Sequence, residues 1–335
     1  MRGISKRNGW TTDCYDLPLL SLPQLRHKIL GEKRVGWDIR PESVQAQHYG
    51  GDMITNWRWL ILSLLVPVTF MTSITVIGAK EKLNPEELVR LHLESVGSSE
   101  ALAGRTSSRA DGAGTLTFVS RTGQIRGPAV FTSDGRKLRM SMEFGIINYP
   151  AEEVCFDGEN VDVGYLAPGK RSPLGSFLYN YEEIVGEGLF GGVLSTAWPL
   201  LDLDGRQPKL KYEGLKKVEG KKYHTLKYQP KEGGEVTTKL HFEQETFRHI
   251  YTIHQIRLRP HGRMSAYEPE SRQTLKEAFS DFRTLGNLTL PIKWSIELST
   301  EAGRTTSVFR WDSDYKGIGF NPEIEPDHFK LNEVK

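Results

Sequence analysis

Apolar and polar residues alternate along many short stretches of the chain after about residue 110, which is typical of β-strands with one buried face. The clearest case is 138–144, where Leu138, Met140, Met142 and Phe144 occupy every second position and so lie on one face of a strand. Tight turns separate consecutive stretches, so we expect neighbouring antiparallel strands. Strands are predicted at 115–118, 154–156, 161–163, 223–228, 238–242, 248–258, 279–283, 292–298 and 307–311.

One helix is predicted before these strands. Asn84 can cap its first turn, Pro85 suits the first helical position, and Glu87 is placed for a capping box. Gly97 is a natural end for this helix. Its apolar positions favour one side, so the helix needs a surface to cover.

The segment 174–201 interrupts the strands with apolar residues at mostly helical spacing. Glycines interrupt it in turn, at 186, 188, 191 and 192, and glycine weakens helices. We interpret it as broken helices packed over or into the sheet, and an ordinary buried helix is the alternative. An antiparallel sheet with one preceding helix and one helical insertion makes an α+β fold.

Charge is distributed unevenly along the chain. The net charge is +2, yet residues 1–79 carry +3 and the remainder −1. The larger part therefore has no basic excess that would drive binding to nucleic acid.

Residues 59–79 contain no charged side chain and follow Arg58. The densest apolar part is short, polar residues follow it, and the run ends at Ile77-Gly78-Ala79. This order matches a secretory signal peptide with cleavage after Ala79. A membrane anchor formed by 59–79 is the alternative, because 21 uncharged residues can span a bilayer.

A signal peptide should begin near the start of translation, and Met53 would give a normal beginning. We therefore interpret 1–52 as a probable mis-called N-terminal extension and 53–79 as the signal peptide. Residues 80–335 then form the working domain, which we expect to be exported to the periplasm and soluble after cleavage.

Catalytic and metal-binding patterns are not expected. Cys155 lies between Val154 and Phe156 and is interpreted as a core residue without a disulfide partner. His249 and His254 are an odd number of positions apart on one predicted strand, so we expect them to face opposite sides, with His241 as a surface or cross-strand residue. The sequence therefore predicts no enzyme activity, no metal and no cofactor.

Adjacent acidic residues occur as pairs that cannot face one another on a strand or helix. We expect them to be exposed to solvent: Glu86-Glu87, Glu152-Glu153 and Glu182-Glu183.

Four short motifs, in this order along the chain, carry a resemblance to a known family: Lys209–Gly214, Val218–Leu226, Phe282–Pro291 and Phe320–Phe329. Together with the order of predicted elements, they resemble the outer-membrane lipoprotein-sorting proteins of the LolA/LolB/LppX-like superfamily over roughly residues 83–331. The resemblance implies a strongly curved antiparallel sheet, an incomplete β-barrel, whose concave face is covered by the N-terminal helix and the helical insertion. It also implies a non-catalytic carrier of lipid or lipoprotein acyl chains, with envelope transport proteins as partners and only transient membrane contact.

An acyl chain needs an apolar wall, and burial of each CH₂ contributes about 0.8 kcal/mol. The alternative function is a structural or interaction module of the envelope without a ligand cavity. For the carrier we predict a cavity between sheet and insertion lined by Leu138, Met140, Met142, Phe144, Phe177, Leu189, Phe190, Trp294 and Ile296.

Overall fold

The computed structural model describes residues 83–118, 123–258 and 270–331. The predicted extension at 1–52 and the predicted signal peptide at 53–79, with its cleavage site at Ala79, lie outside these residues. Among the helices of the described part, none is long and apolar enough to cross a membrane.

The predicted first helix is present as α1 (Pro85–Val96), followed by the short α2 (Ser99–Ala103). The Asn84 side chain accepts a hydrogen bond of 2.7 Å from the backbone N–H of Glu87, as the capping pattern predicts. The helix ends at Gly97. Its apolar side is buried through Leu88, Val89 and Val96, so α1 packs against the rest of the domain.

Five strands follow α2 and pair in sequence order. β1, β3 and β4 are longer than the predicted stretches, β5 matches its prediction, and β2 was not predicted. Small and charged residues break strict alternation in β1 and β2. The strands are β1 (Ser107–Phe118), β2 (Gln124–Asp134), β3 (Lys137–Ile146), β4 (Tyr149–Phe156) and β5 (Val161–Val163).

The whole segment between β5 and β8, which contains 174–201, is called the insertion from here on. It begins with a two-stranded ribbon and continues as short helical pieces. No continuous helix forms within 174–201, so broken helices are the correct interpretation. The pieces are β6 (Tyr165–Ala167), β7 (Lys170–Arg171), α3 (Pro173–Asn180), α4 (Glu183–Gly186), η1 (Gly192–Leu194), η2 (Pro199–Leu201) and α5 (Leu203–Arg206).

The second run of strands also pairs in sequence order, and its last strand returns to β1. A 3-10 turn, η4 (Pro326–Phe329), follows it. The run comprises β8 (Lys209–Val218), β9 (Lys221–Gln229), β10 (Thr237–Glu243), β11 (His249–Leu258), β12 (Ser271–Leu285), β13 (Leu288–Ala302) and β14 (Thr305–Phe320).

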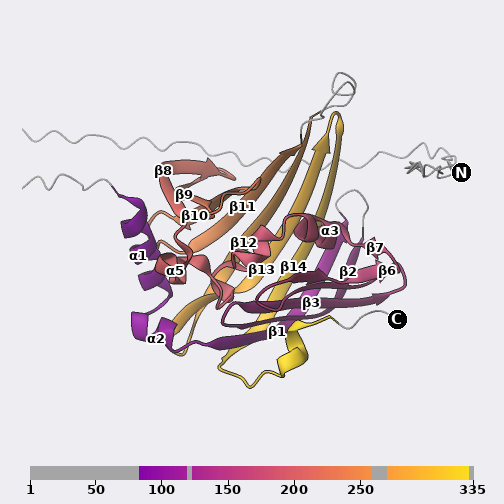
Figure 1. Cartoon of the computed structure of the whole chain (residues 1–335), viewed down its shortest axis with the longest axis horizontal. Helices are drawn as coiled ribbons and strands as arrows, with labels where there is room; N and C mark the ends of the chain where they lie inside the picture. Colours follow the sequence, from indigo (N-terminus) through magenta and orange to yellow (C-terminus); the bar gives the residue numbers. More distant parts are fainter. Residues whose placement is uncertain (1–82, 119–122, 259–269, 332–335) are drawn as a thin grey trace, which may run out of the picture. The chain divides into compact units, whose positions relative to one another are not determined.

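All twelve strands form one antiparallel sheet in the order β5-β4-β3-β2-β1-β14-β13-β12-β11-β10-β9-β8. Within the described residues β5 and β8 remain at opposite edges, so the barrel is incomplete. The sheet is curved, and the insertion crosses the space between the two runs of strands (Figure 1). Its pieces pack on β4 and β5 through α3 and on β11 and β13 through η1. The predicted α+β fold is confirmed.

The prediction that His249 and His254 face opposite sides is wrong, because both are fully buried on the concave face. The pairing of β10 with β11 shifts by one residue between His241 and Phe242. This bulge adds one residue to β11 and brings the two histidines to the same face. His241 and His254 are cross-strand residues, as expected, each 3.0 Å from a threonine hydroxyl of the neighbouring strand.

Candidate functional site

The candidate site is the concave face of the sheet together with the insertion that covers it. All nine predicted cavity residues are buried in one apolar cluster, and the most accessible of them, Phe144, is only 6% exposed. The sheet supplies Leu138, Met140, Met142, Phe144, Trp294 and Ile296, and the insertion supplies Phe177, Leu189 and Phe190. The insertion therefore fills the concave face in this structure.

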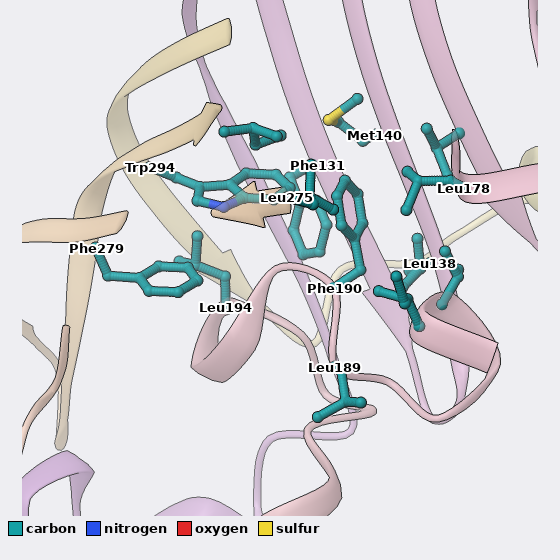
Figure 2. Close-up of a cluster of buried hydrophobic side chains, with 14 of the residues drawn as sticks. Phe131, Leu138, Met140, Leu178, Leu189, Phe190, Leu194, Leu275, Phe279 and Trp294 are labelled. Carbon is teal, nitrogen blue, oxygen red and sulfur yellow. The ribbon is translucent and has the colours of Figure 1, made fainter. Parts of the chain in front are cut away.

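Aromatic side chains from three parts of the chain meet at one end of this face. Figure 2 shows Phe190 pointing from the insertion toward Phe131 of β2 and Trp294 of β13. The ring centroids of Phe190 and Phe131 lie 5.0 and 5.3 Å from that of Trp294, at edge-on angles. Phe279 of β12 stacks 6.4 Å from the same tryptophan. We call Phe131, Phe190, Phe279 and Trp294 the covered end.

Glycines allow the insertion to approach the sheet closely at the covered end. Gly191 and Gly192 have φ values of +81° and +51°, which side chains with a Cβ rarely adopt. A Cβ at Gly191 would lie 2.7 Å from the ring of Phe131, and one at Gly192 would lie 2.8 Å from Phe279. These two glycines therefore serve close packing.

A buried carboxylate anchors the same loop. Glu277 of β12 is fully buried and accepts hydrogen bonds from the backbone N–H of Gly191 at 2.8 Å and from the Trp294 indole N–H at 3.0 Å. Its other oxygen lies 3.4 Å from Nε2 of His254. A buried carboxylate is tolerated only when it has partners, so this loop and this strand depend on one another.

Arg105, which precedes β1, also reaches the insertion. Its guanidinium donates hydrogen bonds to the carbonyls of Val193, at 3.1 Å, and Ser195, at 2.8 Å. Burial lowers the pKa of Arg105 to about 10, so the side chain remains a cation at neutral pH. It supplies donors to carbonyls at the C-terminal end of the short η1 turn.

Two histidines complete the contact between α1 and the insertion. The indole of Trp198 donates to Nε2 of His92 at 3.2 Å, and Nδ1 of His92 lies 3.2 Å from the carbonyl of Phe247. The ring of His249 stacks on Trp198 with centroids 4.8 Å apart. Burial lowers the pKa of His92 to about 4 and lowers that of His249 well below its usual value, so both are neutral at pH 7.

The other end of the concave face is less completely covered. Phe118 of β1 and Phe309 of β14 are paired across the two strands, with ring centroids 6.0 Å apart, and both are partly exposed. Tyr149 of β4 lies 6.2 Å from Phe118 and 5.8 Å from Phe144. We call Phe118, Phe144, Tyr149 and Phe309 the aromatic end.

Glu152 lies beside the aromatic end and corrects the expectation that the Glu152-Glu153 pair is solvated. It is only 2% exposed, because it alternates with the inward residues Val154 and Phe156 of β4. It accepts hydrogen bonds from the hydroxyls of Tyr149 and Ser172, the latter at 2.6 Å. Burial raises the pKa of Glu152 to about 7, in spite of these donors. Ser172 also caps α3, so this network links the insertion to β4.

Among the nine predicted residues, Trp294 also borders a hollow of about 420 Å³ that crosses β12, β13, β14 and β1. The other residues around it are small or charged and mostly alternate with the concave-face positions. This hollow therefore belongs to the outer face of the sheet and differs in chemistry from the predicted apolar cavity. Its charged neighbours are Arg126, Lys293, Asp312 and Asp314.

Cys155 is a buried free thiol, as predicted. Burial raises its pKa to about 12, so it is protonated at neutral pH and a poor nucleophile. In the part of the chain that the structure describes, no three histidine, cysteine or acidic side chains are grouped as metal ligands.

Sequence reasoning missed Glu277, Arg105 and the aromatic end, apart from Phe144. Glu277 occupies an inward position between Leu275 and Phe279, and an acidic residue in such an alternating row is a usable signal. Phe118 and Phe309 were within predicted strands, but their pairing depends on the long-range contact of β1 with β14. Arg105 follows a short helix in an irregular stretch that has no periodic pattern.

No family model matches this sequence, and no curated protein matches it either. Several solved structures are similar to the chain. A DUF1329 family protein from Desulfovibrio piger has 11% identity and a TM-score of 0.43, with 74% of this chain and 98% of that chain covered. A LolA superfamily protein from Nitrosomonas europaea has 11% identity and a TM-score of 0.41, covering 75% of this chain and 99% of the other.

A candidate outer membrane lipoprotein-sorting protein domain from Vibrio parahaemolyticus has 10% identity and a TM-score of 0.34, covering 73% of this chain and 96% of the other. These structures include proteins whose names carry the superfamily that the sequence motifs resemble. At identities of 10–11% and TM-scores below 0.5, the similarity identifies no ligand.

Proposed function

We propose that this chain is a non-catalytic carrier that shelters an acyl chain of a lipid or lipoprotein against the concave face of its sheet. The observation that carries the proposal is the aromatic end. Phe118 and Phe309 are partly exposed and pack against the large buried apolar cluster of this face. A partly exposed apolar surface that continues into a buried apolar wall suits a ligand without polar groups along its length.

An acyl chain would enter at the aromatic end and extend toward Met142 and Met140. Methionine side chains are unbranched and adapt to neighbouring groups, so both can move aside without a change in the backbone. Each CH₂ of the chain that is removed from water contributes about 0.8 kcal/mol. Burial of an acyl chain requires no hydrogen-bonding or charged groups at fixed positions, which is consistent with a carrier.

The insertion that covers the concave face would not move as one piece. The loop from Gly191 to Trp198 is held by Glu277, Arg105 and His92. The α3 segment is held mainly by apolar contacts and by the hydroxyl of Ser172. Displacement of α3 therefore costs fewer buried hydrogen bonds than displacement of the loop, and we place the entry beneath α3.

Binding of a fluorescent fatty-acyl probe tests this proposal. Phe309→Ala should weaken binding by about tenfold, because loss of a phenyl contact of the order of 1.5 kcal/mol corresponds to that factor. Phe320→Ala is the matched control, since Phe320 is also a partly buried phenylalanine of β14 and lies at the opposite end of the strand. Thermal unfolding of both variants is measured alongside.

The carrier proposal fails if the stable wild-type protein takes up no acyl probe at any probe concentration up to the critical micelle concentration of the probe. Equal loss of binding in Phe309→Ala and Phe320→Ala would instead contradict the placement at the aromatic end. A polar substitution such as Met142→Asn is less decisive, because Met142 is fully buried and its replacement also destabilises the fold.

A second candidate function is an interaction module of the cell envelope without a ligand cavity. The complete burial of the predicted cavity residues favours it, because a filled core needs no ligand. The two functions differ in one observable property. The module predicts no acyl uptake and no change in unfolding temperature when acyl lipid is added, whereas a carrier is stabilised by ligand that binds its folded state.

The proposed site of action is the periplasm, with envelope transport proteins as partners and transient contact with membranes. Export would begin from Met53 and end with cleavage after Ala79, leaving Lys80 as the first residue. N-terminal sequencing of the exported protein tests this step separately. A mature N-terminus within 1–52, or an uncleaved protein retained in the membrane, would contradict it.

A further inference from the structure

The outer face of the sheet contains a second hollow, of about 220 Å³, that is unrelated to the concave face. It is lined by residues of β1, β2, β3 and η4: Arg109, Val130, Thr132, Arg139, Ser141 and His328. Two of these side chains are guanidinium groups, and the others supply two hydroxyls, one imidazole and one small apolar contact. The hollow thus gathers hydrogen-bond donors around a small volume.

Strand register places the donors. Arg109 is opposite Thr132, and Thr132 is opposite Arg139, so the threonine lies between the two arginines on adjacent strands. Neighbouring strands are about 4.8 Å apart, and the arginines are therefore separated by about 10 Å at the backbone. Both arginines and Thr132 line the hollow, whose volume of about 220 Å³ has room for one small ligand.

Two polar atoms in this hollow lack partners among the described residues. Thr132 is 1% exposed, yet its hydroxyl has no hydrogen-bond partner, and Nε2 of His328 is likewise buried and unpaired. Burial of such groups without a partner is costly. Both residues line the hollow, so a ligand that accepts hydrogen bonds would satisfy both atoms once a small movement of the two side chains turns them toward it.

The arginines already have other contacts, and these hold them in place. Arg139 donates to the carbonyl of His328 at 2.9 Å and to the carboxylate of Glu153 at 2.8 Å. Arg109 contacts Asp111, two residues along β1, through Nε and Nη2. The hydrogen bond from Arg139 to the His328 carbonyl joins β3 to η4, and these two elements form one wall of the hollow. Surface ion pairs of this kind contribute little stability by themselves. Neither pair supplies a partner for the Thr132 hydroxyl or for Nε2 of His328.

We propose that this hollow is a binding site for a phosphate-class oxyanion, held by Arg109, Arg139, Thr132 and His328. Guanidinium groups recognise tetrahedral oxyanions through charge-assisted hydrogen bonds, and the hydroxyl and imidazole groups supply neutral donors. The ligand is free inorganic phosphate or a phosphomonoester headgroup at a lipid surface, since both present the same oxygens. The site is independent of whether the concave face binds an acyl chain.

Isothermal titration calorimetry with inorganic phosphate tests the site in the full chain, with sodium chloride of equal ionic strength as the reference. Arg109→Gln should weaken phosphate binding by about tenfold or more, because a charge-assisted hydrogen bond is lost. Thr132→Val removes the unpaired hydroxyl at nearly constant volume and should weaken binding severalfold without loss of stability. Arg126→Gln is the matched control, since Arg126 is an exposed arginine of β2 outside this hollow.

Flotation with vesicles of phosphatidylcholine, with and without phosphatidic acid, separates the two sources of phosphate. Binding to either phosphate source that weakens in Arg109→Gln and Thr132→Val, but not in Arg126→Gln, supports the site. The proposal is overturned if neither source binds beyond the chloride reference, or if all three variants bind as the wild type does. Thermal unfolding of each variant confirms that it is folded before binding is compared.

Discussion

The covered end and the aromatic end of the concave face are closed in different ways. At the covered end the insertion is fixed by buried hydrogen bonds, with Glu277 on Gly191 and Arg105 on two carbonyls. At the aromatic end the phenylalanines Phe118 and Phe309 pack on one another and stay partly exposed. The same sheet face thus has one closure fixed by buried hydrogen bonds to the loop of the insertion, and one in which phenylalanine contacts lie beside the smaller network of Tyr149, Glu152 and Ser172.

This difference indicates where the molecule can open. Buried polar anchors are costly to break because each leaves an unsatisfied donor or acceptor, whereas apolar contacts can be replaced by a ligand of similar chemistry. A carrier needs both properties, since the fixed part preserves the fold while the other admits cargo. The predictions below test this contrast.

The largest effect is expected from Glu277→Ala at the covered end. The substitution leaves the Gly191 N–H and the Trp294 indole without their acceptor, so the free energy of unfolding should fall by about 3–5 kcal/mol. Denaturant unfolding measures this loss. Glu301→Ala, on the exposed end of β13 with Arg272 3.9 Å away, should change stability by less than about 1 kcal/mol. Comparable losses in the two variants would contradict the anchoring role of Glu277.

A smaller loss is expected from Gly191→Ala. The new Cβ would meet Phe131 at 2.7 Å and would require a φ of +81°, so we expect destabilisation of about 1–3 kcal/mol. Gly186→Ala is the matched control, because Gly186 is in α4 and its nearest neighbour would be 3.9 Å away. This control should be neutral or slightly stabilising. If both variants behave alike, the close packing at the covered end is not the reason for its glycines.

A fall in pH should loosen the covered end, and a rise in pH from 4.5 to 7 should loosen the contact of α3 with β4. The pKa of His92 is about 4 in the folded protein against an ordinary value of 6.5, so the unfolded state binds more protons between these values. Stability of the covered end is therefore lost as pH falls from 6.5 toward 4, by up to about 1.4 kcal/mol per pH unit. The pKa of Glu152 is about 7 against 4.5, so its contribution is present at low pH and is lost as pH rises through 7.

Hydrogen exchange, corrected for intrinsic rates, measures this pH effect by segment. Protection at 190–198 should fall below pH 6.5, and protection at 172–178 should fall as pH rises from 4.5 to 7. His92→Asn should flatten the acid response of the covered end and leave the response of the other segment unchanged. Loss of protection in both segments in the same direction with pH would contradict the assignment.

Local patterns in the sequence were sufficient for most of the strands, for the first helix and for the burial of the apolar residues that were predicted to line the cavity. Leu138 to Phe144 alternates because one face of β3 is buried, and that burial leaves a direct trace in the sequence. The capped start of α1 is equally local, since Asn84 and Glu87 are three positions apart.

Pairing between strands that are distant in the sequence produces no comparable local pattern of residues. The contact between β1 and β14 joins residues about 200 positions apart, so it could not be read from periodicity. The bulge between β10 and β11 likewise reversed the expected face of one histidine. Glu152 was misplaced because its burial depends on Tyr149 and on Ser172, which belongs to another segment.

The smallest effect is expected from Cys155→Ala. Cys155 alternates with Val154 and lies on the outer side of β4, where it is 1% exposed. The substitution should cost on the order of 1 kcal/mol, and acyl binding should be unchanged because the side chain is remote from the concave face. A large fall in acyl uptake with normal unfolding would show that the cavity is placed on the wrong side of the sheet.

The most direct test of the carrier function is native mass spectrometry of the full chain purified from its host. The account predicts a population of protein with the added mass of one acyl lipid, and loss of that population in Phe309→Ala but not in Phe320→Ala. Wild-type protein observed only at its own mass, under conditions that preserve lipid in a known carrier, would contradict the account.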